Sequence, residues 1–197
     1  MTVRKQHVDF YRKLLLRKRL CSKAVDGAVY VPFVGDGDLA VALYADRPIY
    51  AADIDPKRVE TARARLPHAE IRTADCNVWP FPDISEPFAI GDLDAYCNPY
   101  LALEAFWAHA QKTRRVVLFG TDGLKQLIAR KQSVVQLPTG TCVPAETREW
   151  RAQHNVWAVK YVKPYLERTL TGGKLTIWAH YNRHWMVYWG IVVEICG

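Results

Sequence analysis

Short apolar runs alternate with amphipathic stretches over residues 28–120. Four of these runs have the length of strands, 28–34, 48–53, 88–93 and 115–120, and residues 70–73 predict a further short strand between the second and third of them. Between them, apolar residues at every third or fourth position predict three helices: 38–45, 56–66 and 101–111. Strands that alternate with helices in this way predict an α/β fold, with a parallel sheet and right-handed crossovers.

The remaining pattern is less regular and then turns to β-structure. It predicts a helix at 124–131, a loop at 136–144, and a long helix at 146–170 that breaks or ends near Pro164. Residues 174–181 and 184–195 predict an antiparallel hairpin that turns at Asn182-Arg183. We expect one domain over 28–197, preceded by a basic N-terminal helix or arm over 1–27.

A glycine turn follows the first apolar run, where Gly35 and Gly37 flank Asp36. Glycine allows the backbone to approach a ligand closely, because it has no Cβ. Asp53 ends the second run, where nucleotide-binding α/β folds place a carboxylate against ribose hydroxyls. Because Asp36 and Asp38 would repel a pyrophosphate, S-adenosylmethionine fits this turn better than a dinucleotide. The alternative is a Gly-Asp-Gly turn that binds nothing.

Acidic residues follow four of the predicted strands. In a parallel sheet their segments meet at one edge: the turn 35–37, Asp53-Ile54-Asp55, Asp75-Cys76 and Asp92-Leu93-Asp94. A single aspartate at such a position is most often a turn or cap residue. Four together repel one another unless they bind something, so their conjunction indicates a ligand site.

With these motifs in this order, residues 28–195 resemble class I S-adenosylmethionine-dependent methyltransferases. The resemblance implies a Rossmann-like fold whose seven-stranded, mostly parallel sheet ends in a C-terminal antiparallel hairpin. It implies S-adenosylmethionine as the cofactor, with the glycines beside the methionine moiety, Asp53 on the ribose and Asp75 near the adenine amino group. The expected cofactor contacts are Pro32, Gly35, Asp36, Gly37, Asp53, Ile54, Asp75, Cys76 and Asp92.

The segment from Asp92 to Tyr100 reads Asp-Leu-Asp-Ala-Tyr-Cys-Asn-Pro-Tyr. It is similar to the Asp-Leu-Asp-Pro-Phe/Tyr-Gly-Ser-Pro segment of tRNA guanine N2-methyltransferases. Its end is also similar to the Asn-Pro-Pro-Tyr motif of DNA amino-methyltransferases. Both families methylate an exocyclic base nitrogen, whose lone pair is delocalised until an acceptor holds the N–H. The resemblance implies Asp94, Asn98 and Tyr96 as catalytic residues, with Tyr96, Pro99 and Tyr100 against a flipped base.

The net charge of +7 lies at one end of the chain. Residues 1–25 hold eight of the 27 basic residues and one of the 20 acidic ones. Within a helix predicted over 8–24, Val8, Tyr11, Leu14 and Leu15 form the apolar stripe. A basic helix with aromatic residues predicts a nucleic-acid grip, to which we assign Arg12, Arg17 and Arg19. The alternatives are a helix that packs its leucines on the core with solvated arginines, or contact with an anionic membrane surface.

Other function classes are disfavoured by composition. No apolar run approaches the roughly 18 residues of a membrane span. The five scattered cysteines predict neither a disulfide scaffold nor a metal site, and favour a reducing cytoplasm. We therefore expect a methyltransferase of a nucleic-acid base nitrogen, with RNA favoured over DNA and with a possible protein partner for target recognition. The alternatives are a small-molecule or protein methyltransferase and a non-catalytic binding module.

Overall fold

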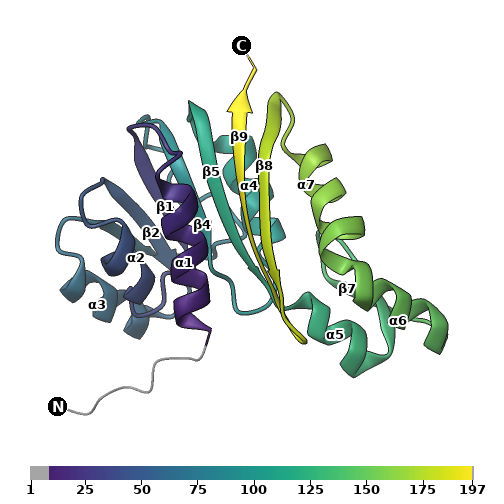
Figure 1. Cartoon of the computed structure of the whole chain (residues 1–197). Helices are drawn as coiled ribbons and strands as arrows, with labels where there is room; N and C mark the ends of the chain where they lie inside the picture. Colours follow the sequence, from purple (N-terminus) through teal and green to yellow (C-terminus); the bar gives the residue numbers. More distant parts are fainter. Residues whose placement is uncertain (1–8, 197) are drawn as a thin grey trace.

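The computed structural model describes residues 9–196, in which helices flank one twisted central sheet (Figure 1). The sheet has seven strands in the order β3-β2-β1-β4-β5-β9-β8. Their bounds are β1 Ala28–Pro32, β2 Ile49–Asp53, β3 Glu70–Thr73, β4 Phe88–Leu93, β5 Lys112–Asp122, β8 Gly173–Asn182 and β9 Val187–Ile195. β1 to β5 run parallel, and β9 is antiparallel to both β5 and β8. The predicted α/β fold and its C-terminal hairpin are confirmed.

Eight helical segments are described: α1 Phe10–Cys21, α2 Asp38–Leu43, α3 Pro56–Arg65, α4 Tyr100–His109, α5 Leu124–Lys131, α6 Thr147–Val156, η1 Trp157–Val162 and α7 Lys163–Thr169. Successive residues of a strand face opposite sides of a sheet. Accordingly, Val29 and Val31 of β1 join a core with α1, α2 and α3, whereas Ala28 and Tyr30 join a core with α4, α5, η1 and α7. The helices therefore form one layer on each face of the sheet.

The C-terminal helical run differs from the predicted single helix. It is α-helical to Val156, π-helical over η1, and α-helical again in α7. Pro164 causes no break, because it lies in the first turn of α7, where its missing N–H is not needed. The hairpin at the end of the sheet also turns later than predicted, with the Arg183 N–H bonded to the Met186 carbonyl at 2.8 Å.

The prediction of a loop at 136–144 is wrong, because most of these residues belong to a small β-hairpin. β6 (Ser133–Gln136) pairs antiparallel with β7 (Thr141–Pro144) across a turn at 137–140. Pro138 lies in that turn and Pro144 ends β7, so neither proline interrupts the ladder. The prolines therefore obscured two short β segments in the sequence.

The apolar stripe predicted for the first helix is also wrong. α1 buries Leu16, Arg17 and Leu20, whereas Tyr11 is 62% exposed and Leu15 is 60% exposed. Val8 lies outside the described residues. The helix packs against β5, β8 and β9, so the face that carries Arg17 lies against the sheet.

Candidate functional site

The turns after β1, β2 and β3 are joined by hydrogen bonds at the carboxyl edge of the sheet. The Asp53 carboxylate accepts the Gly35 N–H on Oδ2 at 2.9 Å and the Asp55 N–H on Oδ1 at 3.0 Å. Ala74 donates its N–H to the Asp53 carbonyl at 3.0 Å. Asp53 is thus the common partner of three strand ends that the sequence predicted to meet.

The glycine turn has the backbone that its sequence predicts. Gly35 has φ +55° and Gly37 has φ +80°, a region that glycine adopts without strain. An added Cβ at Gly37 would contact Leu66 at 3.4 Å. At Gly35 it would meet only the Arg58 guanidinium at 3.8 Å, so the surroundings of Gly35 are open.

Two apolar side chains are exposed beside this turn. Ile54 follows Asp53 and is 71% exposed, and Val78 lies three residues after Asp75 and is 66% exposed. Asp75 is exposed and accepts the Asn77 N–H on Oδ1 at 2.9 Å, which leaves acceptor capacity on the carboxylate. Sequence reasoning missed Val78, although an apolar residue just past a strand end was a usable signal.

Two predicted cofactor contacts are buried beneath the turn. Pro32 is buried at the end of β1, and Cys76 is 2% exposed, with its sulfur accepting the Phe33 N–H at 3.3 Å. Burial raises the pKa of Cys76 to about 12, so its thiol is neutral. The side chains of Pro32 and Cys76 therefore support the turn from within the core. The Asp36 carbonyl accepts the Arg65 guanidinium at 2.7 Å.

Asp92 and Arg17 form a buried ion pair, which corrects both of their predicted roles. Arg17 donates from Nε to Oδ2 at 2.7 Å and from Nη2 to Oδ1 at 2.6 Å, and the Tyr44 hydroxyl donates to Oδ2 at 2.8 Å. Burial opposes the charge of Arg17, but Asp92 and Asp94 outweigh it and raise the Arg17 pKa. With exposures of 0% and 1%, Arg17 cannot bind phosphate and Asp92 cannot bind a cofactor.

Asp94 is held through one oxygen only. Its Oδ1 accepts the Lys13 ammonium at 2.7 Å and the Thr121 hydroxyl, and Arg17 Nη2 lies 3.6 Å from the same atom. For Oδ2 the structure gives no partner among residues 9–196. Burial would raise the pKa of Asp94, but Arg17 and Lys13 hold it below its usual value. Asp94 is therefore an ionised acceptor with one oxygen available.

The rest of the predicted catalytic segment divides between surface and core. Tyr96 is 87% exposed. The Asn98 amide accepts the Tyr100 N–H at 2.9 Å and donates to the Pro138 carbonyl at 2.8 Å, which links the segment to the β6–β7 turn. Pro99 and Tyr100 are buried, so the prediction that they contact a flipped base is wrong.

Asp122, at the end of β5, is a residue to which the sequence analysis gave no role. Its carboxylate accepts the Tyr100 hydroxyl at 2.5 Å, the Trp157 indole N–H at 2.6 Å and the Leu124 N–H at 2.7 Å. Burial raises its pKa to about 6. Its position at the end of a strand, before Gly123, was the signal. Asp122 joins α4, α5 and η1 below the candidate site.

Arg12 and Arg19 project from the side of α1 that faces away from the sheet. With Tyr11, Leu15 and Lys18 they are exposed, and we call these five residues the outer face of α1. Across the described residues no helix is long and apolar enough to cross a bilayer. Within 9–196, no three His, Cys, Asp or Glu side chains form a group that could hold a metal ion.

A scan against protein-family models finds no match, and neither does a search of curated proteins. Solved structures do match. The N-methyltransferase NodS from Bradyrhizobium japonicum WM9, in complex with S-adenosyl-L-homocysteine, has a TM-score of 0.62 at 12% identity over 98% of this chain and 89% of that one. Magnesium protoporphyrin IX methyltransferase (ChlM) from Synechocystis PCC 6803 has a TM-score of 0.57 at 11% identity, over 97% and 89%.

TrmN from Thermus thermophilus has a TM-score of 0.54 at 18% identity, over 95% of this chain and 52% of that chain. This chain therefore spans about half the length of TrmN. At such identities the matches establish the Rossmann-like class I methyltransferase fold. A shared fold does not select a substrate, so these matches leave the methyl acceptor open.

Proposed function

We propose that this chain is an S-adenosylmethionine-dependent methyltransferase. The observation that carries the proposal is the Asp53 carboxylate, bonded to the Gly35 turn where the strand order reverses between β1 and β4. In open α/β sheets, ligands bind at this switch point. A carboxylate has about four acceptor sites, and two of those on Asp53 are used, so two remain for a ribose diol.

The neighbouring side chains also fit this cofactor. Ile54 and Val78 offer exposed apolar surface to the faces of an adenine ring, and Asp75 offers an acceptor to its amino group. The open space at Gly35 suits the methionine end. When bound, S-adenosylmethionine supplies an electrophilic methyl group on a positively charged sulfur.

We further propose that the methyl acceptor is an exocyclic nitrogen of a nucleic-acid base, with RNA favoured over DNA by the resemblance to tRNA methyltransferases. Three features support this substrate class. Asp94 lies in the segment similar to theirs, Tyr96 is an exposed aromatic two residues away, and the outer face of α1 is basic. Stacking on aromatics and contact with cations are the usual means of holding single-stranded nucleic acid.

The geometry at Asp94 suits the chemistry of an aromatic amine. Lys13 and Thr121 fix Oδ1, so that Oδ2 is positioned to accept an amine N–H. That hydrogen bond draws the nitrogen lone pair out of conjugation. A carboxylate with a lowered pKa is a weak base, but it suffices here, because a methylated aromatic aminium is a strong acid and releases its proton readily.

Calorimetric titration with S-adenosylhomocysteine tests the cofactor assignment. Asp53→Ala removes the acceptors for the ribose diol and for the Gly35 N–H, so we expect binding at least about tenfold weaker than in the wild type. Asp46→Ala is the matched control, because Asp46 is an exposed turn residue. If the wild type shows no saturable binding, or if both variants bind equally well, the assignment is wrong.

Transfer of a labelled methyl group to RNA, DNA, protein and small metabolites tests the reaction. Asp94→Asn keeps an Oδ1 acceptor for Lys13 but puts an amide donor where Oδ2 was. We expect turnover to fall about 100-fold or more with little change in cofactor affinity, and Asp26→Asn to leave both unchanged. Undiminished turnover would remove Asp94 from the mechanism. Label found only in protein or in small metabolites would reject the nucleic-acid substrate while leaving the methyltransferase.

A further inference from the structure

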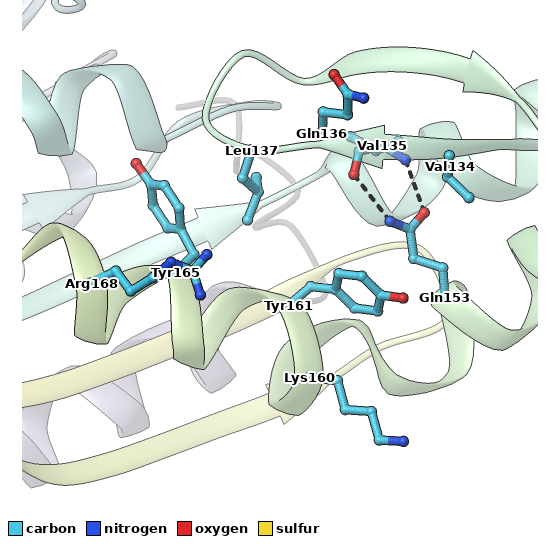
Figure 2. Close-up of a pocket in the computed structure, with 9 residues that line it drawn as sticks. All are labelled: Val134, Val135, Gln136, Leu137, Gln153, Lys160, Tyr161, Tyr165 and Arg168. Atoms are coloured by element: carbon cyan, nitrogen blue, oxygen red, sulfur yellow. Dashed lines mark hydrogen bonds between the residues drawn. The ribbon is translucent and has the colours of Figure 1, made fainter.

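A cavity of about 560 Å³ lies between the β6–β7 hairpin and the helical run α6–η1–α7. Its strand wall is formed by residues 134–137, and its helical wall by Gln153, Lys160, Tyr161, Tyr165 and Arg168 (Figure 2). None of these residues belongs to the glycine turn or to the segments around Asp53 and Asp94. The methyltransferase site therefore does not account for this cavity.

The walls of the cavity are fixed by internal hydrogen bonds. The Gln153 amide accepts the Val135 N–H at 2.9 Å and donates to the Val135 carbonyl at 3.0 Å, as Figure 2 shows. It thus satisfies the free edge of β6 as a neighbouring strand would. The Tyr165 hydroxyl donates to Glu104 of α4 at 2.9 Å. These polar groups are already paired, so recognition falls to the other side chains.

The polar and aromatic groups that remain are two cations, the Gln136 side-chain amide and one aromatic ring. Lys160 and Arg168 form no ion pair with any residue in 9–196, and no carboxylate lines the cavity. Tyr161 is 41% exposed, and its ring stacks on Trp157 at 5.5 Å with 21° between the planes. Trp157 is fully buried and bonded to Asp122. The Tyr161 ring is therefore held in place before any ligand arrives.

We propose that this cavity binds a nucleotide, with its base stacked on Tyr161 and its phosphate bound by Arg168. Base stacking on a fixed aromatic ring needs little ordering, and guanidinium groups match phosphate geometry. The inference rests on the proposed function, because the bound nucleotide would be part of the nucleic-acid substrate and would lie near the base that is methylated. Leu137 lines the cavity, and the next residue, Pro138, accepts the Asn98 amide of the candidate catalytic segment.

Binding of adenosine 5′-monophosphate and of a six-nucleotide single-stranded RNA, measured by calorimetry, tests the proposal. We expect Tyr161→Ala and Arg168→Ala each to weaken binding about tenfold. The matched controls are Tyr181→Ala, at a tyrosine of 40% exposure on β8, and Arg114→Ala on β5, and both should stay within about twofold of the wild type. If the RNA binds much more tightly than adenosine 5′-monophosphate, the natural ligand is a nucleotide within an RNA chain. If the two bind equally, the natural ligand is a free nucleotide.

Tyr161→Leu covers the possibility that the alanine variant unfolds, because leucine still packs on Trp157 but offers no ring. If neither ligand binds saturably to the wild type, or if the cavity variants match their controls, the proposal is wrong. Binding of a phosphotyrosine peptide in place of both nucleotides would also overturn it. The same variants are titrated with S-adenosylhomocysteine. This second titration distinguishes a failure of the cofactor site, which would contradict the proposed function, from a failure of the nucleotide site in the cavity.

Discussion

Three aspartates, Asp92, Asp94 and Asp122, lie at the ends of β4 and β5, and each is stabilised in a different way. Asp92 is neutralised by Arg17 in a buried pair, and Asp94 is held by Lys13 on one oxygen. Asp122 forms no ion pair within 9–196 and relies on neutral hydrogen-bond donors. Because cations favour the charged form and burial disfavours it, the pKa of Asp94 is lowered and that of Asp122 is raised.

The raised pKa of Asp122 predicts a pH dependence of stability. Burial moves it from 3.8 to about 6, so the folded chain binds this proton more tightly than the unfolded chain does. Its stabilising contribution is fully present below about pH 4 and is lost as the pH rises through about 6, a change of about 3 kcal/mol. The difference in unfolding free energy between wild type and Asp122→Asn, measured by urea denaturation from pH 4 to 7, should follow that curve.

Asp46→Asn, at an exposed turn, is the control for this measurement. Parallel curves for wild type and Asp122→Asn would mean that Asp122 does not titrate in this range.

The positions of residues at strand ends were predictable from the sequence, and contacts that depend on a distant partner were not. Asp53 and the glycine turn came from local pattern alone. The pairing of Arg17 with Asp92 joins residues 75 positions apart and requires the orientation of α1, which the pattern of its apolar residues gave wrongly. The same limit explains why the sequence predicted that Tyr100 contacts a flipped base, since its partner Asp122 lies on the next strand.

At the scale of elements, the seven strands of the main sheet were predictable because most contain an apolar run bounded by turn residues or by a predicted helix. The β6–β7 hairpin was not, because a side chain of α6, Gln153, satisfies one edge of β6. This hairpin matters for the candidate site. Its turn accepts a hydrogen bond from Asn98 at the Pro138 carbonyl, so it borders the segment that carries Asp94.

Two glycines with the same backbone φ allow the packing of the β6–β7 turn to be measured, because one of them lies in that turn and the other does not. Gly140 and Gly172 both have φ +74°. A Cβ at Gly140 would lie 2.8 Å from Leu124 Cδ2, on a side chain that is 2% exposed, whereas a Cβ at Gly172 meets nothing within 4 Å. Gly172→Ala should cost about 1 kcal/mol for the left-handed backbone, and Gly140→Ala about 1–3 kcal/mol more for overpacking. Urea denaturation of both variants measures the difference, and equal losses would show that the turn is not packed on α5.

At the scale of the whole molecule, the basic N-terminal segment is less available than its composition suggests. Lys13 and Arg17 carry two of its charges, and both are used against Asp94 and Asp92 within the fold. Arg4 and Lys5 lie outside the described residues. The cations that face solvent on α1 are those of its outer face, together with the exposed Lys23 just beyond the helix. One helix thus both neutralises carboxylates of the sheet through Lys13 and Arg17 and exposes cations on its outer face.

This division predicts how RNA binding depends on salt. If the outer face of α1 contacts phosphates, the triple variant Arg12→Gln, Lys18→Gln, Arg19→Gln loses three such contacts, and the slope of log affinity against log salt should fall by about 2 for a single strand. Filter binding of a single-stranded RNA over a range of salt concentrations measures that slope.

The control variant, with Arg114, Arg130 and Lys174 changed to Gln, has the same net charge and should keep most of the slope. Because all six side chains are exposed, both variants should unfold within about 0.5 kcal/mol of the wild type. Equal slopes for the two variants would show that the attraction comes from net charge alone, and that α1 serves the fold rather than an RNA partner.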